Sequence, residues 1–255
     1  MHRPRVIPIL SLIENRIVST QQFKSPIYIG DPINTIKLFN DKHVDEIILL
    51  DIRSSSNGNL PNYKLIESIS SECFMPLSYG GAIKSLSHAK KIFDLGIEKI
   101  ILNSICYENI NLIKEISTVY GRQSVVVSID YKKNIFGKFK FISKSLKKKN
   151  KINSQNHLKL LKEIGIGELL VTCINNNGSF MGYDYSLLSS LKELDIPIVI
   201  NGGLSSISDM EEAFQKGYNA VAGTSFFVFQ KNNKNSILIN YPKSNQIKNL
   251  INYAV

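Results

Sequence analysis

The chain has 255 residues, of which 43% are hydrophobic and 20% are charged, a composition typical of a globular protein large enough to form one α/β barrel. Its net charge of +10 includes a lysine-rich run from Lys144 to Lys151, but no aromatic or arginine residues accompany this run, which favours a solvated loop over a phosphate or nucleic-acid contact. No apolar run approaches the ~18 residues of a membrane span and no secretory segment follows Met1, so we expect neither membrane insertion nor export.

Eight short runs rich in β-branched residues follow one another at intervals too long for hairpins. In chain order they cover residues 6–11, 46–52, 75–81, 99–104, 125–130, 168–174, 197–203 and 220–225. Segments with helical spacing lie between them. One begins at Asp31 and Pro32, which suit an N-cap and a first helical position, and another ends at Gly96, which suits a C-cap. Strands that alternate with helices predict a parallel (β/α)8 TIM barrel.

An internal repeat divides this predicted barrel. The stretch "YGGAIKSLSHAKKIFDLGIEKIILNS" matches "NGGLSSISDMEEAFQKGYNAVAGTS", so that Gly80 aligns with Gly202 and Ser104 with Ser225. The chain thus consists of two similar halves, about residues 1–120 and 121–255. Because neither half can close a barrel alone, we expect one domain over residues 1–255. The segment 135–150, after the fifth strand, is predicted to form a β-ribbon that covers the mouth of the barrel.

The chemistry of such a barrel lies at the carboxyl ends of its strands. Each half offers one Gly-Gly loop beside one hydroxyl-bearing loop. Backbone N–H groups can approach a phosphate closely where glycine leaves no Cβ in the way, at the N-terminus of a helix. Two matched sites at the mouth predict a substrate with a phosphate at each end. The candidate residues are Gly81, Asn103, Ser104, Gly203, Thr224 and Ser225.

The chain resembles the cyclase subunit of imidazole glycerol phosphate synthase over almost its whole length. The motifs that carry the resemblance are "GDPINTIKLFNDKHVDEIILLDI", "YGGAI" with "ILNS", "VVVSIDYKK", "GELLVTCINNNGSFMGYD" and "NGGLSS". The resemblance implies a (β/α)8 barrel that is paired with a glutaminase subunit. It also implies that ammonia passes through the barrel to a doubly phosphorylated ribulose-formimino substrate, where two aspartates at the ends of strands 1 and 5 carry out the acid–base chemistry.

Matched residue by residue, Asp130 corresponds to the strand-5 aspartate, and Gly178 joins the phosphate-loop positions named above. Ser11 stands where the strand-1 aspartate is expected, and Ser19 stands where the family has a loop lysine. A serine hydroxyl without an activating base cannot replace a carboxylate in proton transfer, and loss of such a group costs about 10²–10⁴-fold in rate. Ser11 therefore predicts that efficient ring closure is absent.

Four charged residues mark the opposite, amino ends of the strands: Arg5, Glu46, Lys99 and Glu168. Buried charges need partners, so two cations and two anions predict a closed ring of salt bridges across the barrel floor. In the resembled family the matching residues form the gate through which ammonia enters from the glutaminase. The alternative is that these side chains are simply exposed at strand starts.

These features favour a divergent paralogue that docks a glutaminase as a heterodimer and conducts ammonia to a phosphorylated acceptor. The resemblance to paralogues in surface-polysaccharide gene clusters implies a role in amidation of surface sugars. The main alternative is an authentic cyclase, a lyase of histidine biosynthesis that converts the bisphosphate substrate and ammonia to imidazole glycerol phosphate and AICAR. A sugar-phosphate isomerase of the related two-phosphate barrel family and a non-enzymatic scaffold are further alternatives.

The remaining reactive residues indicate no additional site. The four histidines show no metal-ligand spacing, so we predict no metal and no cofactor. The three cysteines, Cys73, Cys106 and Cys173, are scattered and form no disulfide framework, which favours a reducing cytoplasm.

Overall fold

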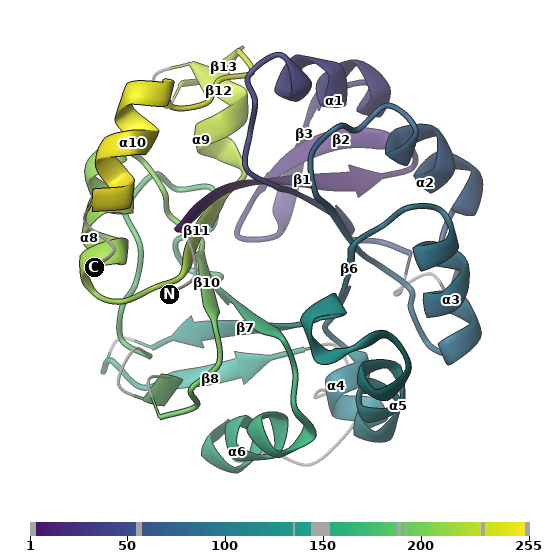
Figure 1. Cartoon of the computed structure of the whole chain (residues 1–255). Helices are drawn as coiled ribbons and strands as arrows, with labels where there is room; N and C mark the ends of the chain where they lie inside the picture. Colours follow the sequence, from purple (N-terminus) through teal and green to yellow (C-terminus); the bar gives the residue numbers. More distant parts are fainter. Residues whose placement is uncertain are drawn as a thin grey trace.

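A closed ring of eight parallel strands with helices around it forms the core of the computed structural model, which describes residues 4–54, 58–134, 136–143, 154–187, 190–191, 193–230 and 233–252 (Figure 1). In ring order the strands are β1 (Arg5–Ile13), β4 (Ile47–Asp51), β5 (Leu77–Gly80), β6 (Lys99–Leu102), β7 (Val125–Lys133), β9 (Glu168–Cys173), β10 (Ile198–Asn201) and β11 (Ala220–Gly223). Parallel pairing of β11 with β1 closes the ring, with Ile7 opposite Ala222. This is the predicted (β/α)8 TIM barrel.

Helices connect the strands on the outside of the ring. They are α1 (Pro32–Asn40), α2 (Tyr63–Ser70), α3 (Leu86–Asp94), α4 (Ile105–Glu108), α5 (Ile110–Tyr120), the 3₁₀ turn η1 (Arg122–Ser124), α6 (Ser154–Ile164), α8 (Ile207–Gln215), α9 (Ser225–Val228) and α10 (Ser244–Asn252). The predicted start of α1 is confirmed, because the Asp31 side chain accepts a hydrogen bond from the Asn34 amide at 3.0 Å and Pro32 takes the first helical position. Gly96, with φ +87°, follows the end of α3 as predicted.

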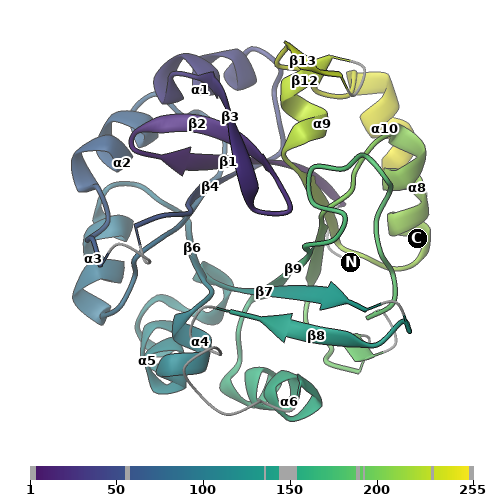
Figure 2. The same ribbon diagram turned by 180° about the vertical axis from the view of Figure 1, so that it is seen from behind.

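Two antiparallel excursions extend from the carboxyl ends of the barrel strands (Figure 2). The first is the hairpin β2 (Arg16–Gln21) and β3 (Lys24–Gly30), which follows β1 and was not expected from the sequence. The second is β8 (Phe139–Ile142), which pairs with β7 and confirms the predicted ribbon over these residues. The rest of that prediction, residues 144–150, lies outside the described residues. A small hairpin, β12 (Phe229–Gln230) with β13 (Asn233–Ile237), follows α9.

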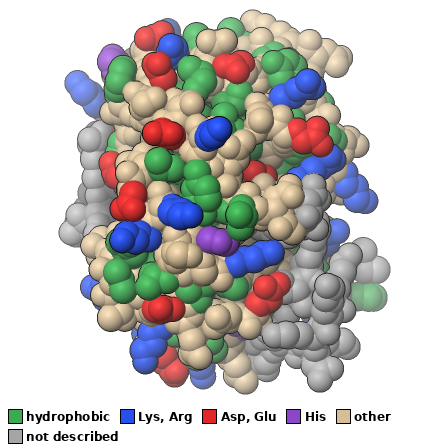
Figure 3. Space-filling model, turned by 90° about the vertical axis from the view of Figure 1, so that its right-hand side faces the viewer, with side chains coloured by type: hydrophobic (Ala, Val, Ile, Leu, Met, Phe, Trp, Pro, Cys, Tyr) green, Lys and Arg blue, Asp and Glu red, His purple; other side chains and the backbone are tan. Residues whose placement is uncertain are grey.

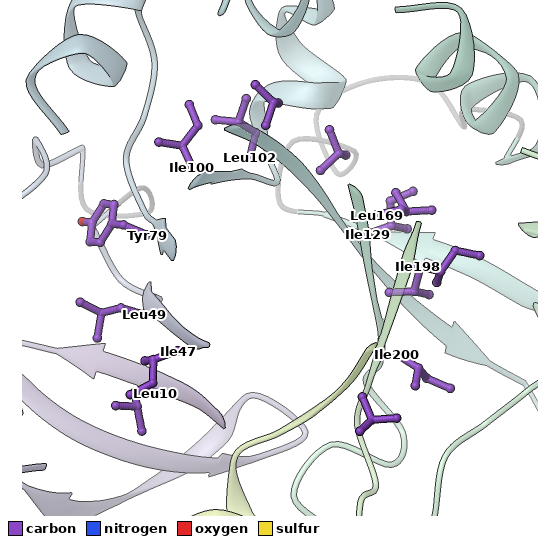
Figure 4. Packing of buried hydrophobic residues seen from close by; sticks show 14 of the residues in the cluster. Leu10, Ile47, Leu49, Tyr79, Ile100, Leu102, Ile129, Leu169, Ile198 and Ile200 are labelled. Carbon is purple, nitrogen blue, oxygen red and sulfur yellow. The ribbon is translucent and has the colours of Figure 1, made fainter. Parts of the chain in front are cut away.

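Alternation along the strands divides the buried side chains into two cores. The larger core packs between strands and helices and includes Leu10, Leu49 and Leu169 (Figure 4). The smaller core fills the inside of the ring. Its members are Ile7, Ile9, Ile48, Ile101, Val126, Leu170, Val199, Ala220 and Ala222, with Leu50 packed against them. The middle of the barrel interior is therefore mainly apolar, with the buried Ser128 opposite Leu170, and most polar groups lie at the two ends.

The outer surface carries charges of both signs. On the side of the barrel that includes α2 and α3, lysine and arginine side chains alternate with aspartate and glutamate rather than forming one basic patch (Figure 3). Within the described residues, no helix has the length and apolar character that would let it cross a membrane.

Candidate functional site

The floor of the barrel, where the strands begin, is closed by the four charged residues that the sequence singled out. Arg5 bonds to both Glu46 and Glu168 through its two terminal nitrogens. Lys99 Nζ lies 3.0 Å from Glu46 Oε2 and 3.4 Å from Glu168 Oε2. Each cation thus touches both anions and each anion both cations. The four side chains form one closed ring of ion pairs, and in this structure none of them is simply exposed.

The carboxylates of this ring are withdrawn from water: Glu46 is 2% exposed and Glu168 is 6% exposed. The Ser78 hydroxyl donates a further hydrogen bond to Glu46 at 2.8 Å, and it was not identified from the sequence. Removal from water lowers the pKa of Arg5, but the charges of Glu168 and Glu46 and their hydrogen bonds more than offset this effect, so the pKa of the guanidinium is raised. The Arg5 guanidinium therefore stays positively charged between the two carboxylates.

Asp130 lies at the other end of the barrel, near the end of the parallel part of β7. Asn103 donates a hydrogen bond to its carboxylate at 2.8 Å, and the Thr172 side chain also bonds to it. Removal from water raises the pKa of Asp130 to about 6, and the hydrogen bonds from Asn103 and Thr172 act in the opposite direction. A carboxyl group that titrates near neutral pH can both accept and donate a proton, as general acid–base catalysis requires.

Ser11 lies across the mouth from Asp130, because β1 and β7 are four strands apart in a ring of eight. It shares the inner face of β1 with Ile7 and Ile9, and it is 8% exposed. Its position is thus the one at which a second carboxylate would face Asp130. The barrel offers one carboxylic acid and one hydroxyl at these two opposed positions.

Two phosphate-loop candidates of the second half, Gly178 and Ser225, contact the β2–β3 hairpin. The Ser19 and Ser225 hydroxyls lie 3.0 Å apart, and both side chains are buried. Gly178, with φ +68°, packs so closely on the hairpin that a Cβ there would lie 2.3 Å from the Thr20 carbonyl oxygen. Gly203, with φ +113°, packs as closely on the segment after β9. The hairpin therefore covers Gly178 and Ser225, whereas Gly203 packs on the chain after β9.

The candidates of the first half are arranged differently. Gly81 packs on Asp51, where a Cβ would lie 2.7 Å from the Asp51 Cβ. Asn103 points to Asp130 and so belongs to the environment of the carboxylate. Ser104 precedes the single-turn helix α4, just as Thr224 precedes α9, and neither hydroxyl is used to cap its helix. These two hydroxyls remain available for other contacts at equivalent places in the two halves.

A cavity of about 260 Å³ lies beside the mouth, between the ends of β7 and β9 and the segment that follows β9; it is lined by Lys133, Asn134, Cys173, Asn175, Asn176 and Asp184. Lys133 Nζ pairs with Asp184 at 3.1 Å, and the Tyr131 hydroxyl donates to Asp184 at 3.0 Å. Burial raises the pKa of the Cys173 thiol, which is therefore protonated at neutral pH. The polar groups of this cavity largely satisfy one another.

Two residues near Asp130 were missed at the level of sequence. Neither Thr172 nor Asn201, the last residue of β10, was identified from the sequence as part of the site. Asn201 Nδ2 donates to Thr172 Oγ1 at 3.1 Å, which extends the hydrogen-bonded group from Asp130 to a third strand. The strand register, with Thr172 opposite both Asp130 and Asn201, explains the link, and it could have been anticipated only by aligning the strand ends.

Comparisons with known proteins agree with this architecture. The model of the family described as "Histidine biosynthesis protein" matches residues 5–232. The chain is 41% identical over 249 residues to the "Putative imidazole glycerol phosphate synthase subunit hisF2" of Pseudomonas aeruginosa, covering 97% of this chain and 99% of that protein. It is 40% identical over 245 residues to a protein of Leptospira borgpetersenii named as a subunit HisF of the same synthase, covering 95% and 96% of the two chains.

A third relative is the imidazole glycerol phosphate synthase subunit HisF of Petrotoga mobilis, which is 34% identical over 225 residues, with 88% of this chain and 89% of the relative covered. The family match spans most of the chain, and all three relatives align with it over nearly their full length. The chain therefore belongs to the histidine biosynthesis protein family and is similar to the HisF subunits of imidazole glycerol phosphate synthase.

Proposed function

We propose that the barrel docks a glutaminase subunit against its floor and conducts ammonia along its axis to a phosphorylated acceptor at the mouth. The observation that carries this proposal is the closed ring of Arg5, Glu46, Lys99 and Glu168. A ring of two buried carboxylates and two half-buried cations points to a role beyond stability, because hydrophobic residues of similar volume often stabilise a fold as well or better. The names of the relatives support a protein partner, since each is described as a subunit.

The interior above the ring suits a small neutral molecule. An ion that enters the apolar middle of the barrel loses its hydration without compensation, whereas ammonia carries no net charge. Because the ion pairs join across the axis, at least one of them must separate before a molecule can pass. Docking of a partner on the floor would provide the binding free energy that opens the ring. When no partner delivers ammonia, the closed ring would keep water and ions out.

At the mouth, we propose Asp130 as the one proton-transferring residue, with Gly81, Asn103, Ser104, Gly178, Gly203, Thr224 and Ser225 forming the phosphate-binding loops. With Ser11 in place of a second acid, the acceptor undergoes a simpler amination than imidazole ring closure. We propose an acceptor from surface-sugar biosynthesis, aminated with a further protein. The alternative is an authentic cyclase of histidine biosynthesis, and the family membership does not distinguish it from a paralogue.

The docking proposal is tested by measuring glutamine hydrolysis by each glutaminase subunit of the same genome, alone and with an equimolar amount of the barrel. We expect one glutaminase to bind the wild-type barrel and to change its turnover. The Lys99→Met variant, which leaves both ring carboxylates with a single cation, should weaken that effect. A change at the exposed pair, Glu72→Gln, is the matched control and should leave it unaltered. If no glutaminase binds or responds, the proposal is wrong.

The choice between paralogue and cyclase is tested separately, with ammonium chloride and the ribulose-formimino bisphosphate substrate. We expect the wild-type barrel to form imidazole glycerol phosphate about 10²–10⁴-fold more slowly than its Ser11→Asp variant, since the variant regains a second proton-transferring group. Equal rates for the two proteins would establish the cyclase alternative. Asp130→Asn provides the background rate in both cases.

A further inference from the structure

The side-chain amide of Asn201 is a buried polar group for which the proposed mechanism has no use. Asn201 ends β10 and shares the inner face of that strand with Val199, which belongs to the apolar interior. It is 5% exposed. Its nitrogen donates to Thr172 Oγ1 at 3.1 Å, but its oxygen, Oδ1, has no hydrogen-bond partner among the described residues. Buried polar atoms without a partner are rare in folded proteins and call for an explanation.

The orientation of this amide is fixed by its neighbours. Thr172 has one hydroxyl proton, and its side chain bonds to the Asp130 carboxylate, which can only accept when ionised. Thr172 Oγ1 must then accept from Asn201, so the nitrogen of the amide faces Thr172 and the oxygen faces elsewhere. Rotating the amide by half a turn would break this chain of hydrogen bonds. Asn201 Oδ1 is thus a preformed acceptor.

The surroundings of the acceptor favour a small ligand that reaches it along the barrel axis. The neighbouring strand β11 contributes only the small side chains Ala220 and Ala222 to the interior, and its register places Ala220 beside Val199. Below Asn201 the interior is mainly apolar down to the charged ring, with the buried Ser128 one layer lower, opposite Leu170. A molecule that moves up from the floor therefore passes Ser128 and then meets Asn201 Oδ1 at the level of Thr172, one hydrogen-bonded residue away from Asp130.

We propose that Asn201 Oδ1 is the acceptor of an ammonia-binding site at the top of the barrel interior, where an N–H of ammonia or ammonium donates to it. The amide holds the nitrogen close to the acceptor loops, and the Thr172 hydroxyl links the site to Asp130. The source of the ammonia rests on the proposed function, but the site itself is complete in the barrel alone. Ammonia fits because it offers N–H donors in a volume close to that of water.

The test is an NMR titration of the isolated barrel labelled with ¹³C at asparagine side-chain carbonyls, using ammonium chloride as the probe. The Asn201 resonance, assigned by its loss in Asn201→Leu, should move saturably as ammonium is added. Tetramethylammonium chloride at the same ionic strength, which has no N–H, should not move it. Asn219 is an internal control, because its Oδ1 already accepts from the Ile198 amide at 2.9 Å and its resonance should stay in place.

A second readout follows the Asp130 carboxyl carbon as a function of pH. If ammonium binds beside ionised Asp130, its addition at about ten times its dissociation constant should lower the Asp130 midpoint by about one pH unit. This shift should vanish in Asn201→Leu and shrink in Thr172→Val. No saturable change of the Asn201 carbonyl, or the same change with tetramethylammonium, would overturn the proposal and leave the oxygen to water.

The outcomes separate this inference from the proposed function. If ammonium binds at Asn201 while no glutaminase associates with the barrel, the site stands and the conduit is wrong. If a glutaminase associates and responds to the barrel while the Asn201 resonance ignores ammonium, the conduit stands and this site is wrong.

Discussion

Replacing Glu46 with glutamine tests whether the floor ring is a desolvated unit. Glu46 is nearly inaccessible to water, and it accepts hydrogen bonds from Arg5, Lys99 and Ser78. Glutamine keeps the size of the side chain but removes its charge. Two half-buried cations, Arg5 and Lys99, then face the single carboxylate of Glu168, and the ring carries an uncompensated positive charge.

The expected cost follows from this imbalance. Breaking a buried ion pair by removing one partner destabilises a fold by about 3–5 kcal/mol. For a chain of this size each kcal/mol lowers the melting temperature by about 2–4 °C, so the variant should melt about 6–20 °C below the wild type. The matched control is Glu72→Gln, which breaks the exposed pair with Lys37, 3.3 Å apart with side chains 53% and 40% exposed. That change should cost about 0–1 kcal/mol.

Urea unfolding followed by circular dichroism measures both variants, and the double variant Arg5→Gln with Glu46→Gln completes the cycle. Because the double variant removes one charge of each sign, it should be more stable than the sum of the two single changes predicts, by about 0.5–3 kcal/mol. High salt should shrink the small effect of Glu72→Gln and leave that of Glu46→Gln nearly unchanged, since buried pairs are little screened. A cost for Glu46→Gln as small as that of the control would refute the closed, dry ring.

Three further predictions concern groups away from the floor. Burial raises the pKa of Asp130 to about 6, above its unfolded value of about 4. The free energy of unfolding should therefore fall as pH rises from about 4 to about 6, because Asp130 then ionises in a buried site. Urea titrations should show this decline in the wild type and not in Asp130→Asn. Burial lowers the pKa of His157 to about 4, below its unfolded value of about 6.5, so the free energy of unfolding should fall as pH drops from about 6.5 to about 4. The His157→Phe variant, which retains the stacking on Tyr107, should not show this fall. Gly203→Ala should yield little folded protein, because its Cβ would lie 1.9 Å from a carbonyl oxygen. The Cβ of Gly96→Ala would have no other atom within 4 Å, so that variant should lose only about 1 kcal/mol through backbone strain. Soluble yield and thermal melting distinguish the two variants.

The parts of the molecule that the sequence predicts are those governed by strand periodicity. Side chains alternate between the two faces of a strand, so a charge two residues before an inward aliphatic residue lies on the inner face as well. Arg5 and Ile7 show this pattern on β1, and Glu168 and Leu170 show it on β9. The ring could be inferred because it depends only on strand starts and on the need of each buried charge for an opposite one.

The contacts that the sequence does not predict depend on side-chain direction and on chain segments far apart. The β2–β3 hairpin was missed because its first turn, Glu14 and Asn15 with φ of 49° and 64°, lacks the glycine that usually marks such a turn. Its packing then decides that Ser19 meets Ser225, more than 200 positions later in the chain. The link from Asn201 to Thr172 likewise needs the strand register, which no local pattern specifies.

The inner face of β1 shows why floor and mouth can diverge independently. Arg5, Ile7, Ile9 and Ser11 follow one another along this face, one layer at a time, from charged ring to apolar middle to polar mouth. A change at Ser11 alters only the top layer, because close packing of the isoleucines separates it from Arg5. The mouth can therefore be altered without disturbing the charged ring of the floor. A barrel with an intact ring and a serine at position 11 is the expected product of such a change, and under the proposed function it would deliver ammonia to a different acceptor.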